Sequence, residues 1–173
     1  MIIKYFETNK INIGNTRKIL LYGKNEGLKK EVLENLINKK ENIYFYEQKE
    51  ILEDKDFFLQ NLLSESLFEK EKIIIIKRAS DKIYDLINEI NEKEIEGITI
   101  IINSENLDKK SKLRSFFEKS KKYACVAFYQ DDDRTLSKLS SSFLKDKKIS
   151  ISPSDINMIV NKCNGDRANL LNE

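Results

Sequence analysis

The chain has 173 residues, of which 40% are hydrophobic and 35% are charged, a balance typical of a globular protein and unlike that of a disordered chain. Its net charge of +2 is too small to indicate nucleic-acid binding by itself, and the lack of histidine excludes the commonest general base and zinc ligand. No apolar run approaches the length of a membrane span, and residues 1–10 lack a signal-peptide core, so we expect a cytoplasmic protein with no membrane partner.

Short apolar runs alternate with segments of helical periodicity as far as residue 130. The runs predict five strands, at residues 19–22, 43–46, 73–76, 98–102 and 123–129. Apolar residues at helical spacing predict four helices between them, beginning near Leu28, Asp54, Ile83 and Leu113, the second of which is expected to reach Phe68. This alternation predicts an α/β fold with a five-stranded parallel sheet flanked by helices.

The pattern changes at residue 131, after which only helices are predicted. Ser152 and Pro153 are typical of a helix start, and Gly165 of a helix end. The chain stops at Glu173, inside the opening of a third helix, so we expect it to be a fragment of a longer protein. The predicted division is an α/β domain at 1–130 and the start of a small, incomplete helical domain at 131–173.

Two cysteines are present, Cys125 in a predicted strand and Cys163 in a predicted helix. They lack the spacing of metal ligands, and their positions indicate buried thiols rather than a disulfide. We therefore expect no metal site and no cofactor.

The loop after the first predicted strand, YGKNEGLKKE, invites a comparison with phosphate-binding loops. Such a loop wraps phosphate with backbone amides and then supplies Lys and a Ser or Thr for magnesium. Gly23 and Gly27 are present, but no Gly-Lys-Ser/Thr follows, and Lys24 lies inside the loop. At the end of the third strand, where an NTPase has an acidic metal ligand, this chain has Lys77 and Arg78. The sequence favours Gly23 and Gly27 as turn and helix-start residues.

Other candidate sites have a structural and a functional interpretation each. Asp131 to Arg134, DDDR, is typical of a helix N-terminus, although a metal site would use the same residues. Six lysines make the helix near Leu113 basic, which fits a solvated outer face or a weak DNA contact: Lys109, Lys110, Lys112, Lys119, Lys121 and Lys122. Five tyrosines fall in predicted strands, where core packing is favoured over base stacking: Tyr22, Tyr44, Tyr46, Tyr123 and Tyr129.

Five segments follow one another along the whole chain in a specific order and spacing: ILLYGKNEGLKKE, SLFEKEKIIIIK, DKKSKLRSFFEK, YQDDDRTL and NGDRANLLNE. In this order and spacing the chain resembles the delta subunit of the bacterial DNA polymerase III clamp loader. This resemblance implies an AAA+-like first domain of the P-loop NTPase type without a working ATP site, followed by a helical lid domain. On this resemblance we expect the chain to cover the first domain and the first part of the lid, and the family's third domain, a helical collar, to lie outside it.

The resemblance implies a non-catalytic subunit of a DNA-directed DNA polymerase holoenzyme. Its partners would be the sliding clamp (beta subunit), the gamma/tau and delta prime subunits of the loader, and primed DNA through the complex. Delta subunits open the ring-shaped clamp with a hydrophobic tip, and the Leu-Phe pair of that tip matches Leu67 and Phe68. The expected polar rim of this contact is Ser64, Glu65, Ser66, Glu69 and Lys70.

The physical chemistry of Leu67 and Phe68 fits such an anchor. Adjacent residues on a helix do not share a face, and Leu59, Leu62 and Leu63 already supply an inward stripe. Fully burying a Leu or Phe contributes about 1.5–3 kcal/mol each. The alternative is that the pair closes the core. Two other functions stay open: a DNA-binding module acting through residues 109–122, and a nucleotide-binding enzyme with a degenerate phosphate loop.

Overall fold

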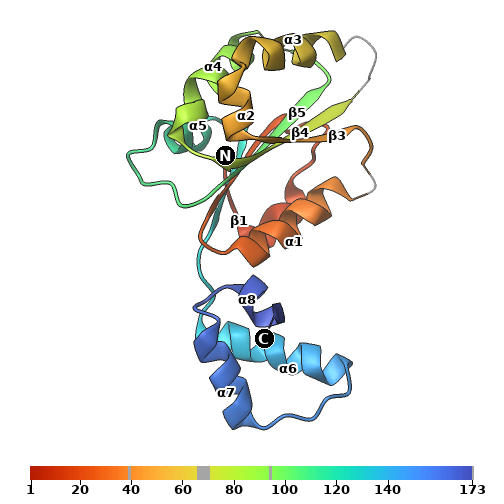
Figure 1. Cartoon of the computed structure of the whole chain (residues 1–173), viewed down its shortest axis with the longest axis vertical. Coiled ribbons are helices and arrows are strands. Elements are labelled where there is room, and N and C mark those ends of the chain that lie inside the picture. Colours follow the sequence, from red (N-terminus) through yellow and green to blue (C-terminus); the bar gives the residue numbers. More distant parts are fainter. Residues whose placement is uncertain (39, 66–70, 94, 173) are drawn as a thin grey trace.

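A six-stranded, all-parallel sheet forms the larger part of the molecule, and three helices follow it (Figure 1). The computed structural model describes residues 1–38, 40–65, 71–93 and 95–172. The strands are β1 (Ile2–Lys4), β2 (Lys18–Gly23), β3 (Ile43–Glu47), β4 (Lys72–Ala79), β5 (Ile98–Ser104) and β6 (Ala124–Phe128). Their order in the sheet is β1-β6-β2-β5-β4-β3. The apolar runs of β2, β4 and β5 are almost continuous because these inner strands are buried on both faces.

The prediction of five strands is wrong, because β1 adds a sixth at the edge of the sheet. β1 pairs with β6 in the register Ile2↔Cys125 and Ile3↔Val126. Its three residues are too few to show a strand period, and only Ile3 is buried. Ile2 is exposed. A strand this short becomes recognisable only beside its partner, which comes from the other end of the α/β unit.

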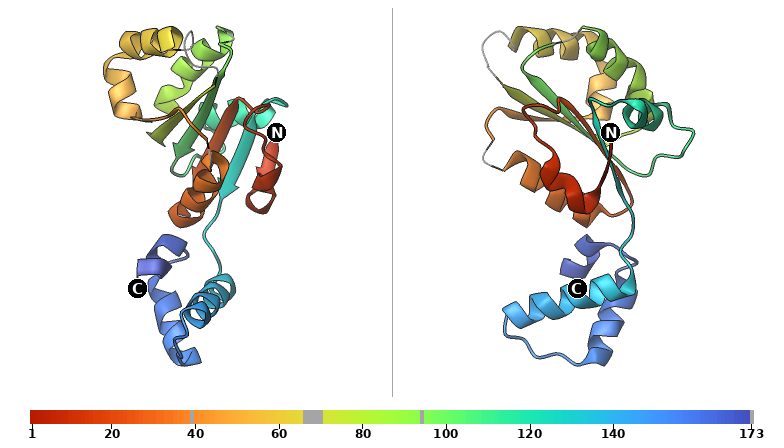
Figure 2. Two further views of the ribbon diagram at one scale, coloured as in Figure 1. Left: turned by 90° about the vertical axis from the view of Figure 1, so that its right-hand side faces the viewer. Right: turned by 180° about the vertical axis from the view of Figure 1, so that it is seen from behind.

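Helices cover the two faces of the sheet unequally. The helix α1 (Glu26–Ile37) and the 3-10 helix η1 (Tyr5–Lys10) lie on one face. The other face carries α2 (Gln48–Glu53), α3 (Lys55–Glu65), η2 (Asp81–Ile83), α4 (Tyr84–Glu92) and α5 (Lys112–Lys119), as the two turned views in Figure 2 also show. None of the helices in the described residues is long and apolar enough to span a bilayer.

The helix α2 was not predicted from the sequence. Glu47 and Glu50 form a capping box that starts α2 directly after β3. Asp54, with an extended φ of −142°, ends α2, and its carboxylate accepts a hydrogen bond from the Phe57 amide in the first turn of α3. The predicted helix of 54–68 thus begins as expected, and its residues 66–68 lie outside the described residues.

Strand side chains alternate between two apolar cores, one on each face of the sheet. Leu20, Ile74 and Ile76 point to the side of α2–α5, and Leu21 and Ile75 point to the side of α1. This alternation follows from the period of two in a strand. Because both faces are filled, a polar side chain can reach solvent mainly at the ends of the strands, which is where a site would form.

Three helices form a separate group beyond β6: α6 (Asp133–Asp146), α7 (Pro153–Lys162) and α8 (Arg167–Asn172). Ser152 caps α7, with Pro153 in its first turn. Leu136, Val160 and Cys163 form the small core of this group. In Figure 1, residues between β6 and α6 run as an extended strap, and α8 lies nearest to α1.

Both cysteines are free and buried, as predicted. Cys125 packs in the core on the α2–α5 side of the sheet, and burial raises the pKa of its thiol to about 12. A thiol with such a pKa stays protonated at neutral pH and is a poor nucleophile.

The inner strands should carry much more of the stability than the new edge strand. Ile75 in β4 is 0% exposed, whereas Ile2 in β1 is 67% exposed. We expect Ile75→Ala to lower the free energy of unfolding by about 2–5 kcal/mol through lost burial and a cavity. The matched change Ile2→Ala should cost less than about 1 kcal/mol. Urea unfolding followed by circular dichroism measures both, and equal losses would contradict this sheet order.

Candidate functional site

The loop between β2 and α1 lies at the carboxyl edge of the sheet, the edge at which α/β proteins bind ligands. Gly23 ends β2 with a φ of +130°, a conformation that favours glycine. Its amide donates to the Glu105 carbonyl at 3.0 Å, and a Cβ at this position would lie 2.1 Å from the Phe128 carbonyl oxygen. The loop is therefore pressed against the ends of β5 and β6. Lys24, the next residue, is exposed.

The first amides of α1, which a phosphate-binding loop would offer to its ligand, already have acceptors within the protein. Asn25 caps the helix, and its side-chain oxygen accepts from the Leu28 amide at 3.1 Å. The carboxylate of Asp166 accepts from the amides of Glu26 (3.2 Å) and Gly27 (3.1 Å). A helix start leaves such amides without intrahelical partners, and here a carboxylate from the far end of the chain fills the place.

Lys29 is a site residue that the sequence analysis missed. Counted from Gly23 in the pattern G-x-x-x-x-G-K-[ST], Leu28 stands at the second glycine, Lys29 at the lysine and Lys30 at the Ser or Thr. The signal was the spacing between Gly23 and Lys29, which the comparison based on Lys24 overlooked. This loop therefore keeps the first glycine and the lysine, and departs from the pattern at the other two positions.

The ammonium group of Lys29 is buried and fully engaged. Its residue is 0% exposed. Its Nζ lies 2.6 Å from Glu26 Oε1 and 2.6 Å from the Ser104 carbonyl at the end of β5. The Ser104 hydroxyl in turn donates to the Ala79 carbonyl at 2.5 Å. Lys29 thus ties α1 to the ends of β5 and β4, and Glu26 supplies the counter-charge that phosphate supplies in a nucleotide site.

A hollow of about 320 Å³ opens beside Lys29 at the ends of β3, β4 and β5. Lys77 and Arg78 line it, at the end of β4 where an NTPase has acidic residues. Lys77 lies over the Phe45 ring at 4.5 Å, and Arg78 pairs with Glu47 at 3.5 Å. Within the described ranges, no group of three or more metal-ligating side chains could hold an ion.

The six lysines predicted to contact DNA are all exposed, but α5 divides them. One trio lies at the start of α5 and the other at its end: Lys109, Lys110 and Lys112, then Lys119, Lys121 and Lys122. Eight helical residues at 1.5 Å each separate the trios by about 12 Å. They are two small basic clusters and not one continuous patch.

The backbone amides at the start of α5 are also taken by a carboxylate. Asp81 accepts hydrogen bonds from the Ser111 hydroxyl and from the amides of Lys112 and Leu113. Burial alone would raise the pKa of Asp81, but these hydrogen bonds hold it below its ordinary value. Only the lysine side chains of this helix start are therefore left for a phosphate group.

The predicted clamp anchor, Leu67 and Phe68, lies outside the described residues, as do the rim residues Ser66, Glu69 and Lys70. Ser64 and Glu65 are in the last turn of α3. Before this segment α3 packs on the sheet, and after it β4 begins at Lys72.

Among the five tyrosines predicted to pack in the core, Tyr129 is the exception. Tyr22, by contrast, is buried at the end of β2 as expected, and burial raises the pKa of its hydroxyl above its ordinary value. Tyr129 is 74% exposed because β6 ends one residue earlier, at Phe128. Its backbone carbonyl still has a role in the loop, since it accepts from the Asn25 side chain at 3.1 Å.

Comparisons with known proteins identify the fold. The sequence matches no protein-family model and no curated protein. Among solved structures, domain III of the replication initiation protein DnaA from Thermotoga maritima aligns with a TM-score of 0.58 and 13% identity over 96% of this chain and 78% of that one. The Bacillus subtilis DNA clamp loader delta protein YqeN gives 0.56 and 14%, over 97% of this chain and 55% of that one.

The Thermotoga maritima RuvB Holliday junction branch migration motor also matches, with a TM-score of 0.55 and 15% identity over 88% of this chain and 51% of that one. This chain therefore spans about half the length of the delta protein and of RuvB. The three neighbours share the AAA+ fold. We conclude that this chain has an AAA+-type α/β fold with a parallel sheet of six strands.

The buried Lys29 should contribute to stability, whereas the exposed Lys24 should not. Lys29→Ala leaves the Ser104 carbonyl without its ammonium donor and leaves space beneath α1. We expect it to lower the free energy of unfolding by about 1–3 kcal/mol, and the control Lys24→Ala to change it by less than about 0.5 kcal/mol. Urea unfolding curves test the pair. Equal effects would mean that Lys29 does not hold α1 to the strand ends.

Proposed function

We propose that this chain is the clamp-binding part of a non-catalytic clamp-loader subunit related to delta. It would bind the sliding clamp and open its ring, so that the ring can be loaded on primed DNA during replication. The support is the likeness in fold to a clamp loader delta protein over 97% of this chain, together with the ordered motifs of the sequence. We propose a cytoplasmic location on the same grounds.

The observation that carries this proposal is the inner face of α3. Phe58, Leu59 and Leu62 are all buried and pack with the core on the α2–α5 side of the sheet. The helix therefore already reaches the sheet through a stripe of its own residues before residue 66. This supports a role for Leu67 and Phe68 outside the core, as an apolar anchor for a partner.

The topology of the sheet suggests from which side a partner of this segment would approach. All strands are parallel, so every amino end lies on one edge of the sheet and every carboxyl end on the other. The first residue of β4, Lys72, lies at the amino edge. The loop of Gly23 and the helices α6–α8 belong to the carboxyl edge. A clamp bound through Leu67 and Phe68 would approach from the side opposite to α6–α8.

Binding energy would do the work in this mechanism. A subunit that binds the open clamp more tightly than the closed clamp shifts the clamp toward opening by that difference in affinity. ATP would be hydrolysed by the gamma/tau subunits, and delta prime would complete the loader. In this proposal residues 1–130 form the AAA+-like domain and residues 131–173 the first part of the lid.

Calorimetric titration with the sliding clamp of the same organism tests the anchor. We expect the wild-type chain to bind and the double variant Leu67→Ala/Phe68→Ala to lose about 2 kcal/mol or more, roughly thirtyfold in Kd. Phe57→Ala is the matched control, since Phe57 is a 60% exposed aromatic residue of the same helix α3. Circular dichroism checks that each variant is folded.

Two results would count against this proposal. Equal binding by the wild type and the double variant would place the clamp contact elsewhere on the chain. No binding by the folded wild type would reject the clamp-loader function for this part of the protein.

A DNA contact is a second candidate, because all six lysines around α5 are exposed. With only three lysines in each cluster, we expect weak binding to duplex DNA with a shallow salt dependence, of slope no steeper than about −3 if one cluster binds. Replacing one trio by glutamine at a time, with filter binding at several salt concentrations, shows which end of α5 is used. A steep slope that both trios share would favour a dedicated DNA-binding module.

A further inference from the structure

We propose that Asp166 is a built-in anion that latches the α6–α8 group onto α1, so that the placement of these helices needs no nucleotide. The latch consists of Asp166 and Arg167 on one side and of Asn25, Gly27 and Asp131 on the other. This inference concerns the carboxyl edge of the sheet and is independent of the clamp contact proposed above.

The first part of the latch is the carboxylate of Asp166. Its two oxygens accept from the amides of Glu26 and Gly27 in α1, and Oδ1 also accepts from the Ala168 amide at 2.8 Å. One side chain thus caps α8 and the start of α1 together. A carboxylate at a helix start is stabilised by the free amides and by the helix dipole. The contact therefore holds the N-terminus of α8 against the N-terminus of α1.

The second part is a charged network behind Asp166. Arg167 forms two hydrogen bonds with Asp131, at 2.7 and 3.2 Å, and a longer contact of 3.3 Å with Glu31 of α1. Asp131 also accepts from the Asn25 side chain at 2.9 Å. Burial alone would lower the pKa of Arg167, but its hydrogen bond and charge interaction with Asp131 raise it. A two-pronged Arg–carboxylate pair is geometrically specific, and this one joins α8 to the strap before α6.

The third part is direct backbone packing between α1 and α8. A Cβ on Gly27 would lie 2.3 Å from the Ala168 amide nitrogen and 2.9 Å from the Arg167 carbonyl carbon. Gly27 is therefore needed here for the close approach of two backbones. The same approach leaves no room for a phosphate group at this helix start.

These contacts decide what a nucleotide would have to displace. A polyphosphate at the loop would compete with Asp166 for the amides of Glu26 and Gly27, and with Glu26 for the ammonium of Lys29. Both competitors are part of the chain, so their effective concentration is high. Side chains of the protein thus occupy the positions that a bound phosphate would take between α1 and the α6–α8 group. The orientation of this group relative to the sheet is therefore set without a nucleotide.

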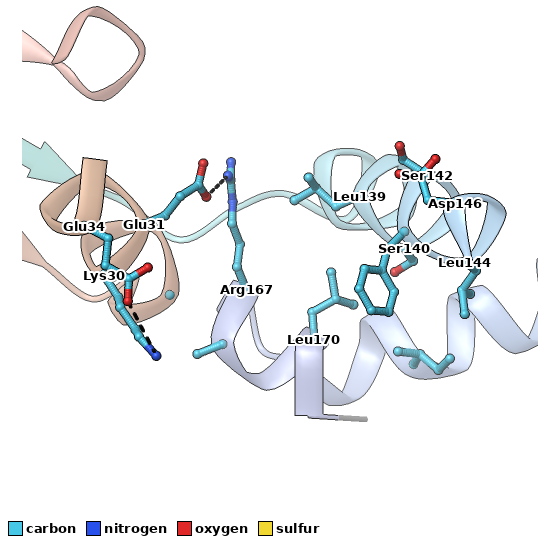
Figure 3. A pocket seen from close by; sticks show the side chains of 14 residues that line it. Lys30, Glu31, Glu34, Leu139, Ser140, Ser142, Leu144, Asp146, Arg167 and Leu170 are labelled. Atoms are coloured by element: carbon cyan, nitrogen blue, oxygen red, sulfur yellow. Dashed lines mark hydrogen bonds and ion pairs between the residues drawn. The ribbon is translucent and has the colours of Figure 1, made fainter. Parts of the chain in front are cut away.

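A groove lies beside the latch, between α1 and the α6–α8 group (Figure 3). Its volume is about 680 Å³. Figure 3 shows Arg167 reaching across to Glu31 at one end of the groove, while Leu139 and Leu170 face it from the helical side. Because this groove separates α1 from the α6–α8 group beside the latch, we expect the Asp166–Arg167 corner to carry much of the attachment.

Distance measurements between two spin labels test the latch. Cysteines at Lys49 in α2 and Lys145 in α6 are suitable sites, because both residues are exposed while the native cysteines are buried. We expect one narrow distance distribution in the otherwise wild-type chain, unchanged by magnesium-ATP. Asp166→Ala should broaden the distribution clearly, and Arg167→Gln should broaden it through the second part of the latch.

Asp155→Ala is the matched control. Asp155 is another carboxylate at a helix start of the same group, but its side chain accepts a hydrogen bond from the Ser152 hydroxyl at the start of its own helix α7. It should leave the distribution narrow. Asp166→Asn keeps a hydrogen-bond acceptor but removes the charge, so it should give a distribution of intermediate width. If circular dichroism shows that Asp166→Ala is unfolded, Asp166→Asn is measured in its place.

The latch is refuted by any of three results. The distribution of the wild-type chain is already broad, or magnesium-ATP shifts it, or the folded Asp166 and Arg167 variants keep the wild-type width. Binding of the clamp plays no part in this measurement, so its outcome is separate from that of the calorimetric titration.

Discussion

The arrangement of this molecule depends on the backbone amides at the start of α1, which have no hydrogen-bond acceptors within the helix itself. A parallel sheet brings all of its carboxyl ends to one edge, and α1 begins there, directly after the central strand β2. Amides that lack helical partners need acceptors wherever water is excluded. In a nucleotide-binding protein phosphate meets that need. Here Asn25 and Asp166 meet it, and the position of the last helix follows from the choice of acceptor.

At the place where a phosphate-binding loop would hold nucleotide, this chain has a structural joint, and the charges of the loop show how it is built. The loop keeps a buried lysine at the spacing of a phosphate-binding loop, and Glu26 balances its charge. Across the hollow, the end of β4 carries Lys77 and Arg78 where a metal-binding acid would stand. The amides and the lysine that would meet phosphate are thus paired with carboxylates of the chain itself. The acid that would meet magnesium is replaced by basic residues.

Most of the fold could be predicted from the sequence, because it depends on local patterns. The apolar runs of β2, β4 and β5 are short, unbroken and buried, and those of β4 and β5 are rich in β-branched residues, which is typical of the inner strands of a parallel sheet. The strand β1 could not be predicted, since three residues carry no period and their partner is remote. The helix α2 was missed because it depends on a capping box that immediately follows a strand.

The candidate site was less predictable, for a different reason. Lys29 could have been found by counting from Gly23, because the loop spacing is local. The role of Asp166 could not, since its carboxylate serves α1 across almost the whole chain, and nothing in its own surroundings distinguishes it from a cap of α8. Contacts between distant segments become visible only when the topology is known.

The edge strand β1 has a consequence for synthesis on the ribosome. The first residues of the chain pair with β6, which is almost the last part of the α/β unit to be made. The amino group of Met1 likewise donates to the carbonyls of Ser120 and Tyr123. Such a long-range pairing forms late, so the nascent chain must hold Ile3 without its partner until β6 emerges. During that interval the side of β2 that receives β6 is open, and it offers a template for wrong pairing with another chain.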